Sequence, residues 1–144
     1  MATSVQVVFD CADPTRLSEF WAATLGYKLQ DPPGGAASWE EWLTAQGIPE
    51  SEWNSASAIV DPDGKGPRIF FQRVPEPKTV KNSVHLDVNA GGGHGVAADE
   101  RRRRVNAEAE RLGTLGASQT RVFEERGEYW IVMADPEGNE FCVQ

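Results

Sequence analysis

The sequence has 144 residues, of which 40% are hydrophobic and 25% charged, and its formal net charge is -8. This length suits one compact domain and is short for two independent ones. The excess of acidic residues excludes the clustered positive surface that nucleic acids and anionic membranes attract, so neither is expected as a partner.

The N-terminal residues and the cysteines predict a cytoplasmic protein. The opening MATSVQVVFDCAD has no basic stretch followed by an apolar core, and no apolar run approaches the ~20 residues of a membrane helix. Two cysteines, Cys11 and Cys142, are too few for a disulfide scaffold. Reduced thiols are expected of an intracellular chain.

The first predicted elements are a strand over residues 4–11 and the helix that follows it. The strand run, SVQVVFDC, is rich in β-branched residues. Asp13 then suits the N-cap and Pro14 the first helical turn, while Gly26 marks the end of the helix. Between them, residues at helical spacing form one mostly apolar stripe, which predicts a helix packed on a sheet: Leu17, Phe20, Trp21, Thr24 and Leu25.

A tryptophan-rich insert, residues 37–54, separates this helix from the next strands. Trp39, Trp42 and Leu43 lie at helical spacing, and Trp53 follows a Gly-Ile-Pro break. Two strand-like runs, SASAIV and RIFFQRV, then flank the sequence Asp-Pro-Asp-Gly. This tetrapeptide predicts a turn, because Pro sets φ at its second position and Gly accepts a positive φ.

The second half of the chain repeats this plan. A strand is predicted over residues 82–89 and, after a Gly-rich loop at 91–95, a helix over residues 99–112. The runs YWIVMA and EFCV flank a second turn, Asp-Pro-Glu-Gly. Strand, helix and three strands are thus written twice, and pairing of the two copies is expected because either alone would leave a sheet face uncovered.

Four motifs taken together, FDCADP, GPRIFFQRVPEPK, KNSVHLDV and DPEGNEFCV, resemble the vicinal oxygen chelate superfamily of glyoxalases, bleomycin resistance proteins and extradiol dioxygenases. Within it, the chain is similar to glyoxalase-like proteins. The resemblance implies one α+β domain over residues 1–144. Two βαβββ modules, residues 1–76 and 81–144, would form a curved, incompletely closed sheet around a cavity. It also implies a homodimer.

The resemblance further implies a test for metal binding. Members that use a metal take four ligands, usually His and Glu, from the first and last strands of the modules, whereas other members bind a small molecule without metal. His85 matches a first-strand ligand, but Gln6 stands at the corresponding place in the first module. Cys142 stands where a last-strand Glu is expected, and Phe70 is its counterpart in the first module.

Aligning the segment GPRIFFQ of the first module with GNEFCVQ of the second places Arg68 opposite Glu140 and Gln72 opposite Gln144. With one typical ligand remaining out of four, no metal cofactor is expected. If a divalent metal such as zinc, nickel or manganese binds, the shifted set is His85, Glu140 and Cys142.

Two hypotheses from different classes follow. In the first, the chain binds a small organic ligand without metal, and the inserted helix covers one end of an apolar cavity suited to planar molecules. The residues expected to contact this ligand are Gln6, Asp10, Phe70, Gln72, His85, Asp87, Glu140 and Cys142.

In the second hypothesis the protein is a lyase or isomerase in which His85 acts as general acid or base, with or without a divalent metal held by Glu140 and Cys142. Asp87 shares a strand face with His85 and resembles an orienting acid. Residues two apart on a strand are about 7 Å apart at Cα, which leaves direct contact open. Cys142 is either a thiol activated by His85 or a half-buried small hydrophobe.

Overall fold

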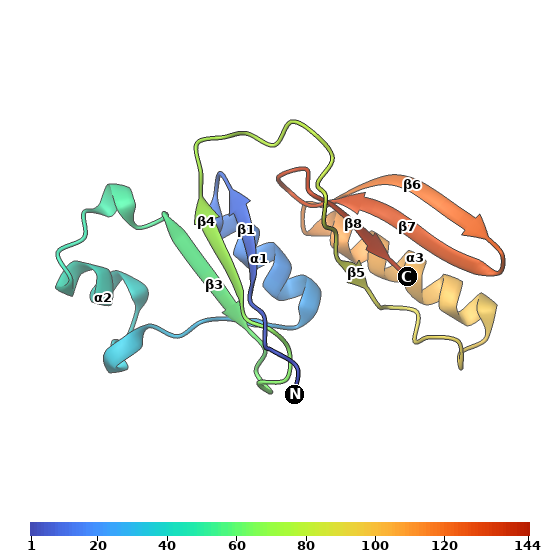
Figure 1. Ribbon diagram of the computed structural model, residues 1–144, viewed down its shortest axis with the longest axis horizontal. Coiled ribbons are helices and arrows are strands. Elements are labelled where there is room, and N and C mark those ends of the chain that lie inside the picture. Colours follow the sequence, from blue (N-terminus) through green and yellow to red (C-terminus); the bar gives the residue numbers. More distant parts are fainter. The chain divides into compact units, whose positions relative to one another are not determined.

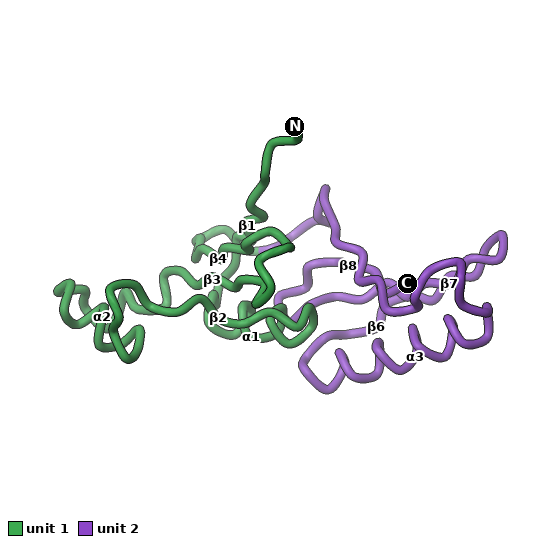
Figure 2. Tube along the Cα trace, turned by 90° about the horizontal axis from the view of Figure 1, so that it is seen from below, with its two compact units in different colours: residues 1–77 green, residues 78–144 purple.

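A computed structural model describes all 144 residues, and it contains no helix that is long and apolar enough to cross a bilayer. The chain divides into two compact units, residues 1–77 and 78–144 (Figure 2). Each unit has a four-stranded sheet with one long helix, and neither sheet closes into a barrel. The predicted α+β fold with two βαβββ modules is confirmed.

Unit 1 carries the first sheet and the insert (Figure 1). In chain order its elements are β1 (Val7–Cys11), α1 (Pro14–Leu25), β2 (Lys28–Leu29), α2 (Trp39–Ala45), β3 (Ala56–Val60) and β4 (Ile69–Arg73). Short 3-10 helices, Pro33–Gly35 and Glu50–Glu52, flank α2. The strand order is β1-β4-β3-β2, in which β1 runs parallel to β4 and the other pairs are antiparallel.

Helix α1 begins and ends where the sequence predicts. The Asp13 side chain accepts a hydrogen bond from the Arg16 backbone N–H at 3.2 Å, and Gly26 adopts a left-handed conformation with φ of 70°. The helix buries Leu17 and Trp21 against the sheet. Because α1 covers one sheet face, the side chains that alternate with this core lie on the opposite face.

Unit 2 repeats the arrangement without an insert. Its elements are β5 (Asp87–Val88), α3 (Ala98–Thr114), β6 (Ser118–Glu125), β7 (Glu128–Ala134) and β8 (Glu140–Val143), in the strand order β5-β8-β7-β6. Strand β5 is parallel to β8. Helix α3 buries Val105, Ala109 and Leu112. The sheet residues of this core are Ile131, Met133, Phe141 and Val143.

The strand predicted over residues 82–89 is shorter in the structure. Only Asp87 and Val88 form a regular strand, and Val84, which lies within the predicted strand, is 81% exposed. The cause is Asn82, whose side-chain amide accepts a hydrogen bond from the Glu140 backbone N–H at 2.8 Å. A side chain therefore takes the place that a strand backbone would have beside Glu140.

Candidate functional site

The predicted site residues of unit 1 lie on the sheet face opposite α1. Strand register pairs Asp10 with Gln72, and the Gln72 amide donates a hydrogen bond of 2.6 Å to the Asp10 carboxylate. Phe70 lies two residues earlier on β4, between the buried Ile69 and Phe71. Gln6 precedes β1 and accepts a hydrogen bond from Arg68. The structure thus brings these four predicted residues onto one face.

The predicted site residues of unit 2 include a group of three potential metal donors. His85, Asp87 and Cys142 place one donor atom each within 4.8 Å of the others. His85 Nε2 lies 3.5 Å from Asp87 Oδ1, and the register of β5 with β8 sets Asp87 beside Cys142. The side chains of His85 and Asp87 are each 44% exposed, so a solute can reach them.

This group borders a depression of about 580 Å³ that is also lined by Trp130 and Gln144. Trp130 stacks on Phe123, with ring centroids 5.1 Å apart. Burial raises the pKa of the Cys142 thiol, and the negative charge of Asp87 and a hydrogen bond to it act in the same direction. The thiol is therefore held protonated, which is the opposite of activation as a nucleophile.

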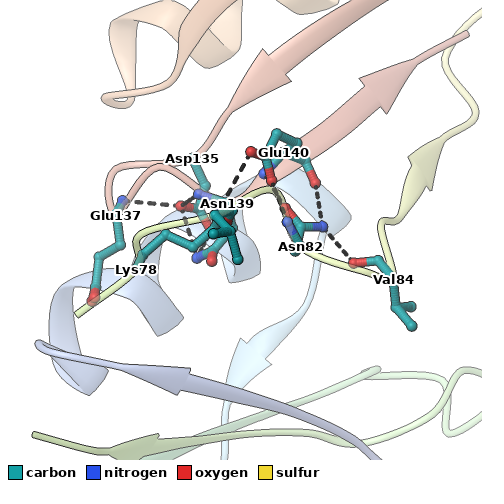
Figure 3. A network of polar contacts seen from close by, with 8 residues as sticks. Lys78, Asn82, Val84, Asp135, Glu137, Asn139 and Glu140 are labelled. Carbon is teal, nitrogen blue, oxygen red and sulfur yellow. Dashed lines mark hydrogen bonds and ion pairs between the residues drawn. The ribbon is translucent and has the colours of Figure 1, made fainter. Parts of the chain in front are cut away.

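Glu140 is held by the segment that leads into β5 (Figure 3). One of its carboxylate oxygens accepts a hydrogen bond from the Asn82 backbone N–H at 3.0 Å, and the other lies 3.2 Å from the Lys78 ammonium. The backbone bond from Asn82 and the charge of Lys78 lower the pKa of Glu140. Both carboxylate oxygens of Glu140 are engaged in these contacts. The group of potential metal ligands therefore contains Asp87, rather than the predicted Glu140, together with His85 and Cys142.

The chemistry of His85, Asp87 and Cys142 fits a divalent metal such as zinc, since imidazole, carboxylate and thiolate are all zinc ligands. The Cys142 thiol would release its proton on binding. The role of Asp87 in such a set was not predicted. Strand alternation already placed it on the same face as His85, but its position beside Cys142 follows from a strand pairing that spans 55 residues.

A second hollow, of about 730 Å³, lies within unit 1 and is mostly apolar. Trp39 and Trp42 of α2 meet edge to face at 5.6 Å between ring centroids. Trp53 and the small residues of β3 line it as well, together with Phe70 of β4 and Arg68, which immediately precedes β4. Arg68, Ala56 and Ala58 were not among the predicted site residues. Ala56 and Ala58 alternate along β3 with Ser57 and the buried Ile59, and Arg68 directly precedes the buried Ile69 of β4.

Comparisons with known proteins identify the family of this chain. Residues 6–144 match the family model described as glyoxalase-like domain. No curated protein matches the chain in sequence.

Solved structures share the fold at low sequence identity. A possible glyoxalase from Bacillus cereus is 14% identical, with a TM-score of 0.62 over 100% of this chain and 99% of that one. The fosfomycin resistance protein FosX from Listeria monocytogenes, complexed with Mn(II) and 1S,2S-dihydroxypropylphosphonic acid, is 11% identical, with a TM-score of 0.61 over 100% and 90%. The bleomycin-binding protein from Streptomyces verticillus, complexed with copper(II)-bleomycin, is 14% identical, with a TM-score of 0.52 over 100% and 96%.

Proposed function

The chain belongs to the glyoxalase-like domain family of the vicinal oxygen chelate superfamily, and we propose that it binds a small organic ligand in the hollow of unit 1. One observation carries this proposal: an apolar hollow of about 730 Å³ walled by three tryptophans and Phe70. Ligand sites are concave, mostly apolar and of this size, with a few polar groups that orient the ligand. We call this hollow the tryptophan pocket.

Binding in the tryptophan pocket requires no metal. The group of metal donors, His85, Asp87 and Cys142, belongs to unit 2, and none of the three lines the pocket. Flat aromatic walls favour a planar ligand that stacks on them or meets their edges. The bleomycin-binding relative is a precedent in this fold for a protein that holds an organic molecule.

A thermal-shift screen of planar aromatic compounds, carried out with EDTA present, tests this function. A ligand that binds the folded state raises the melting temperature, and the shift grows with the logarithm of the ligand concentration above its Kd. Trp42→Ala should abolish the shifts, whereas the matched control Trp130→Ala, which alters a tryptophan of unit 2, should retain them. Shifts that persist in Trp42→Ala would show that the ligand binds elsewhere.

A second candidate function is a lyase or isomerase reaction at His85. The observation in its favour is the exposed group of His85, Asp87 and Cys142 on one sheet face. A divalent metal held by these three residues would supply Lewis-acid polarisation of a substrate oxygen. Without a metal, Asp87 would orient the imidazole of His85 from the Nε2 side, where its carboxylate lies 3.5 Å away, and Nδ1 would be left to accept or donate a proton.

Zinc titration and turnover measurements test this second function. Stoichiometric zinc or manganese that is lost in His85→Ala and kept in His94→Ala would support the metal set, because His94 is a loop residue outside it. Turnover that is unchanged in His85→Ala, with the fold intact by circular dichroism, would remove the acid-base role. If the protein as purified binds no metal in the titration, only the metal-free form of this reaction remains.

We also propose a homodimer. The eight-residue strand β6 forms one edge of its sheet, and most of its side chains are exposed. Sheet edges carry unpaired backbone groups that a second copy can cover. Light scattering on the purified chain measures the mass directly, and a monomer at micromolar concentration would contradict the proposal.

A further inference from the structure

The two modules can be compared position by position through their parallel strand pairs. In unit 1 Val8 pairs with Phe70, and in unit 2 Asp87 pairs with Cys142. Two residues before each of these positions stand Gln6 and Arg68 in unit 1, and His85 and Glu140 in unit 2. Where unit 2 presents metal donors and a carboxylate, unit 1 therefore presents an amide, two apolar side chains and a guanidinium.

The guanidinium of Arg68 is oriented by neutral groups. Its Nε donates to Gln30 Oε1 and its Nη1 donates to Gln6 Oε1, both at 2.6 Å, and its Cζ lies 5.3 Å from the centroid of the Phe70 ring. Amide oxygens satisfy two of its donors and leave its charge uncompensated. Arg68 makes no ion pair, and its Nη2 makes no hydrogen bond within the chain.

Two of the three tryptophans that line the pocket with Arg68 already use their indole N–H groups in hydrogen bonds. Trp39 Nε1 donates to the Gln30 carbonyl at 2.7 Å, and Trp53 Nε1 donates to the Ile48 carbonyl at 3.0 Å. These rings consequently offer carbon surface to a ligand. The methyl groups of Ala56 and Ala58 leave room over β3 for a flat molecule.

Acidic side chains also border the tryptophan pocket and limit the charge of its ligand. Glu40 is exposed on α2, and Glu52 accepts a hydrogen bond from Ser55 and lies 3.9 Å from Arg73. These carboxylates would repel a second negative group. The ligand that matches the pocket carries a single negative charge, placed at the end where Arg68 lies.

We propose that the tryptophan pocket recognises a planar aromatic monocarboxylate, with the carboxylate paired to Arg68 and the ring system against the tryptophans. This inference rests on the proposed function, because it specifies the ligand class of the same pocket. A guanidinium held in place by neutral partners provides a charge-assisted hydrogen bond at Nη2 without prior loss of an internal ion pair.

The test is calorimetric titration of the full chain, with EDTA present, using 2-naphthoate and its neutral isostere 2-naphthamide. Hydrogen bonds to charged groups are strong enough that 2-naphthoate should bind at least about tenfold more tightly. Arg68→Met should lower the affinity for 2-naphthoate to that for 2-naphthamide and leave the amide unaffected. Arg68→Lys should keep part of the preference, and Arg16→Met, which changes an exposed arginine of α1, should keep all of it.

The outcomes separate this inference from the proposed function. Equal affinity for the two probes, unchanged in Arg68→Met and lost in Trp42→Ala, would overturn the inference and leave a binding pocket. No binding of either probe by the folded wild-type chain would overturn the inference together with the proposed pocket. A preference for 2-naphthoate that persists in Arg68→Met would place the carboxylate at another group and would also overturn it.

Discussion

At the scale of single residues, Asp13 joins the start of α1 to the end of the insert. Its carboxylate accepts hydrogen bonds from the Asn54 side chain at 2.8 Å and from the Arg16 backbone N–H. Asn54 in turn accepts from the Thr15 backbone N–H and hydroxyl. The Asn54 bond, followed by the Arg16 bond, lowers the pKa of Asp13 from its ordinary value of 3.8.

Asp13→Ala should lower the free energy of unfolding at pH 6 by about 1 kcal/mol, which is typical of a lost N-cap. The depressed pKa also gives a pH dependence of known sign. The contribution of the ionised Asp13 carboxylate to the free energy of unfolding is fully present above pH ~4 and is lost as the pH falls through the folded-state pKa. Urea unfolding at pH 6 and pH 3 measures both effects.

Asp13→Asn is the matched control for this prediction, because the amide keeps a cap acceptor and cannot titrate. Its loss of stability between pH 6 and pH 3 should be smaller than that of the wild type. An identical acid response in Asp13→Asn and the wild type would show that this carboxylate does not contribute.

At the scale of elements, the Asp of each Asp-Pro-acid-Gly turn accepts hydrogen bonds from backbone N–H groups of its own turn, but the two Asp side chains differ in burial. Asp61 accepts from the backbone N–H groups of Asp63, Lys65 and Gly66. Asp135 accepts from the backbone N–H groups of Glu137 and Asn139 and from the Asn139 side chain, and it is only 4% exposed. Buried donors that lose their acceptor cannot turn to water.

Asp135→Ala should therefore destabilise the protein by about 1–3 kcal/mol, and Asp61→Ala by clearly less. Urea denaturation of both variants under one set of conditions measures the difference. The two substitutions are controls for each other, since the turn sequences are alike and each Asp accepts from at least two backbone N–H groups. Equal losses would mean that the burial of Asp135 is unimportant.

The insert is the second element with a separable role. Helix α2 has no buried residue, whereas the core of unit 1 is made by α1 and its sheet. Replacing residues 37–48 by a Gly/Ser linker of equal length should leave the circular dichroism of the core nearly unchanged. Affinity for 2-naphthoate should fall at least about tenfold, because the replacement removes two aromatic anchors. Retained affinity would exclude α2 as a wall of the ligand site.

At the scale of the whole molecule, the two candidate sites use different residues. The tryptophan pocket is lined by unit 1 alone, and the depression beside His85 by unit 2 alone. Substitutions without shared partners act independently to within about twofold in affinity. His85→Ala should leave 2-naphthoate binding unchanged within this factor, and Trp42→Ala should leave zinc titration unchanged. Calorimetry on both variants measures whether a substitution in one site changes binding at the other. A change larger than twofold would contradict the independence expected of two sites that share no lining residue.

Local signals were sufficient for α1 and insufficient for β5. Asp13, Pro14 and Gly26 act within one helical turn of where they stand, so the ends of α1 follow from the sequence. The strand predicted from residue 82 depends on what lies beside it, and there the Asn82 side chain bonds to a residue 58 positions away. The roles of Gln6, Asp10, Gln72, His85 and the other predicted site residues stay predictions.

From the sequence by itself, the resemblance of its motifs indicated the family and the βαβββ modules. Residue type and short-range spacing indicated the repetition of strands around a helix and the aromatic character of the insert. Tertiary structure alone decided which side chains meet: Asp87 with His85 and Cys142, Glu140 with Asn82 and Lys78, and Arg68 with Gln6 and Gln30. The physical reason is strand register. A pairing shifted by one residue turns every side chain to the other face, and no short turn connects the strands of the parallel pairs β1–β4 and β5–β8 to fix their register.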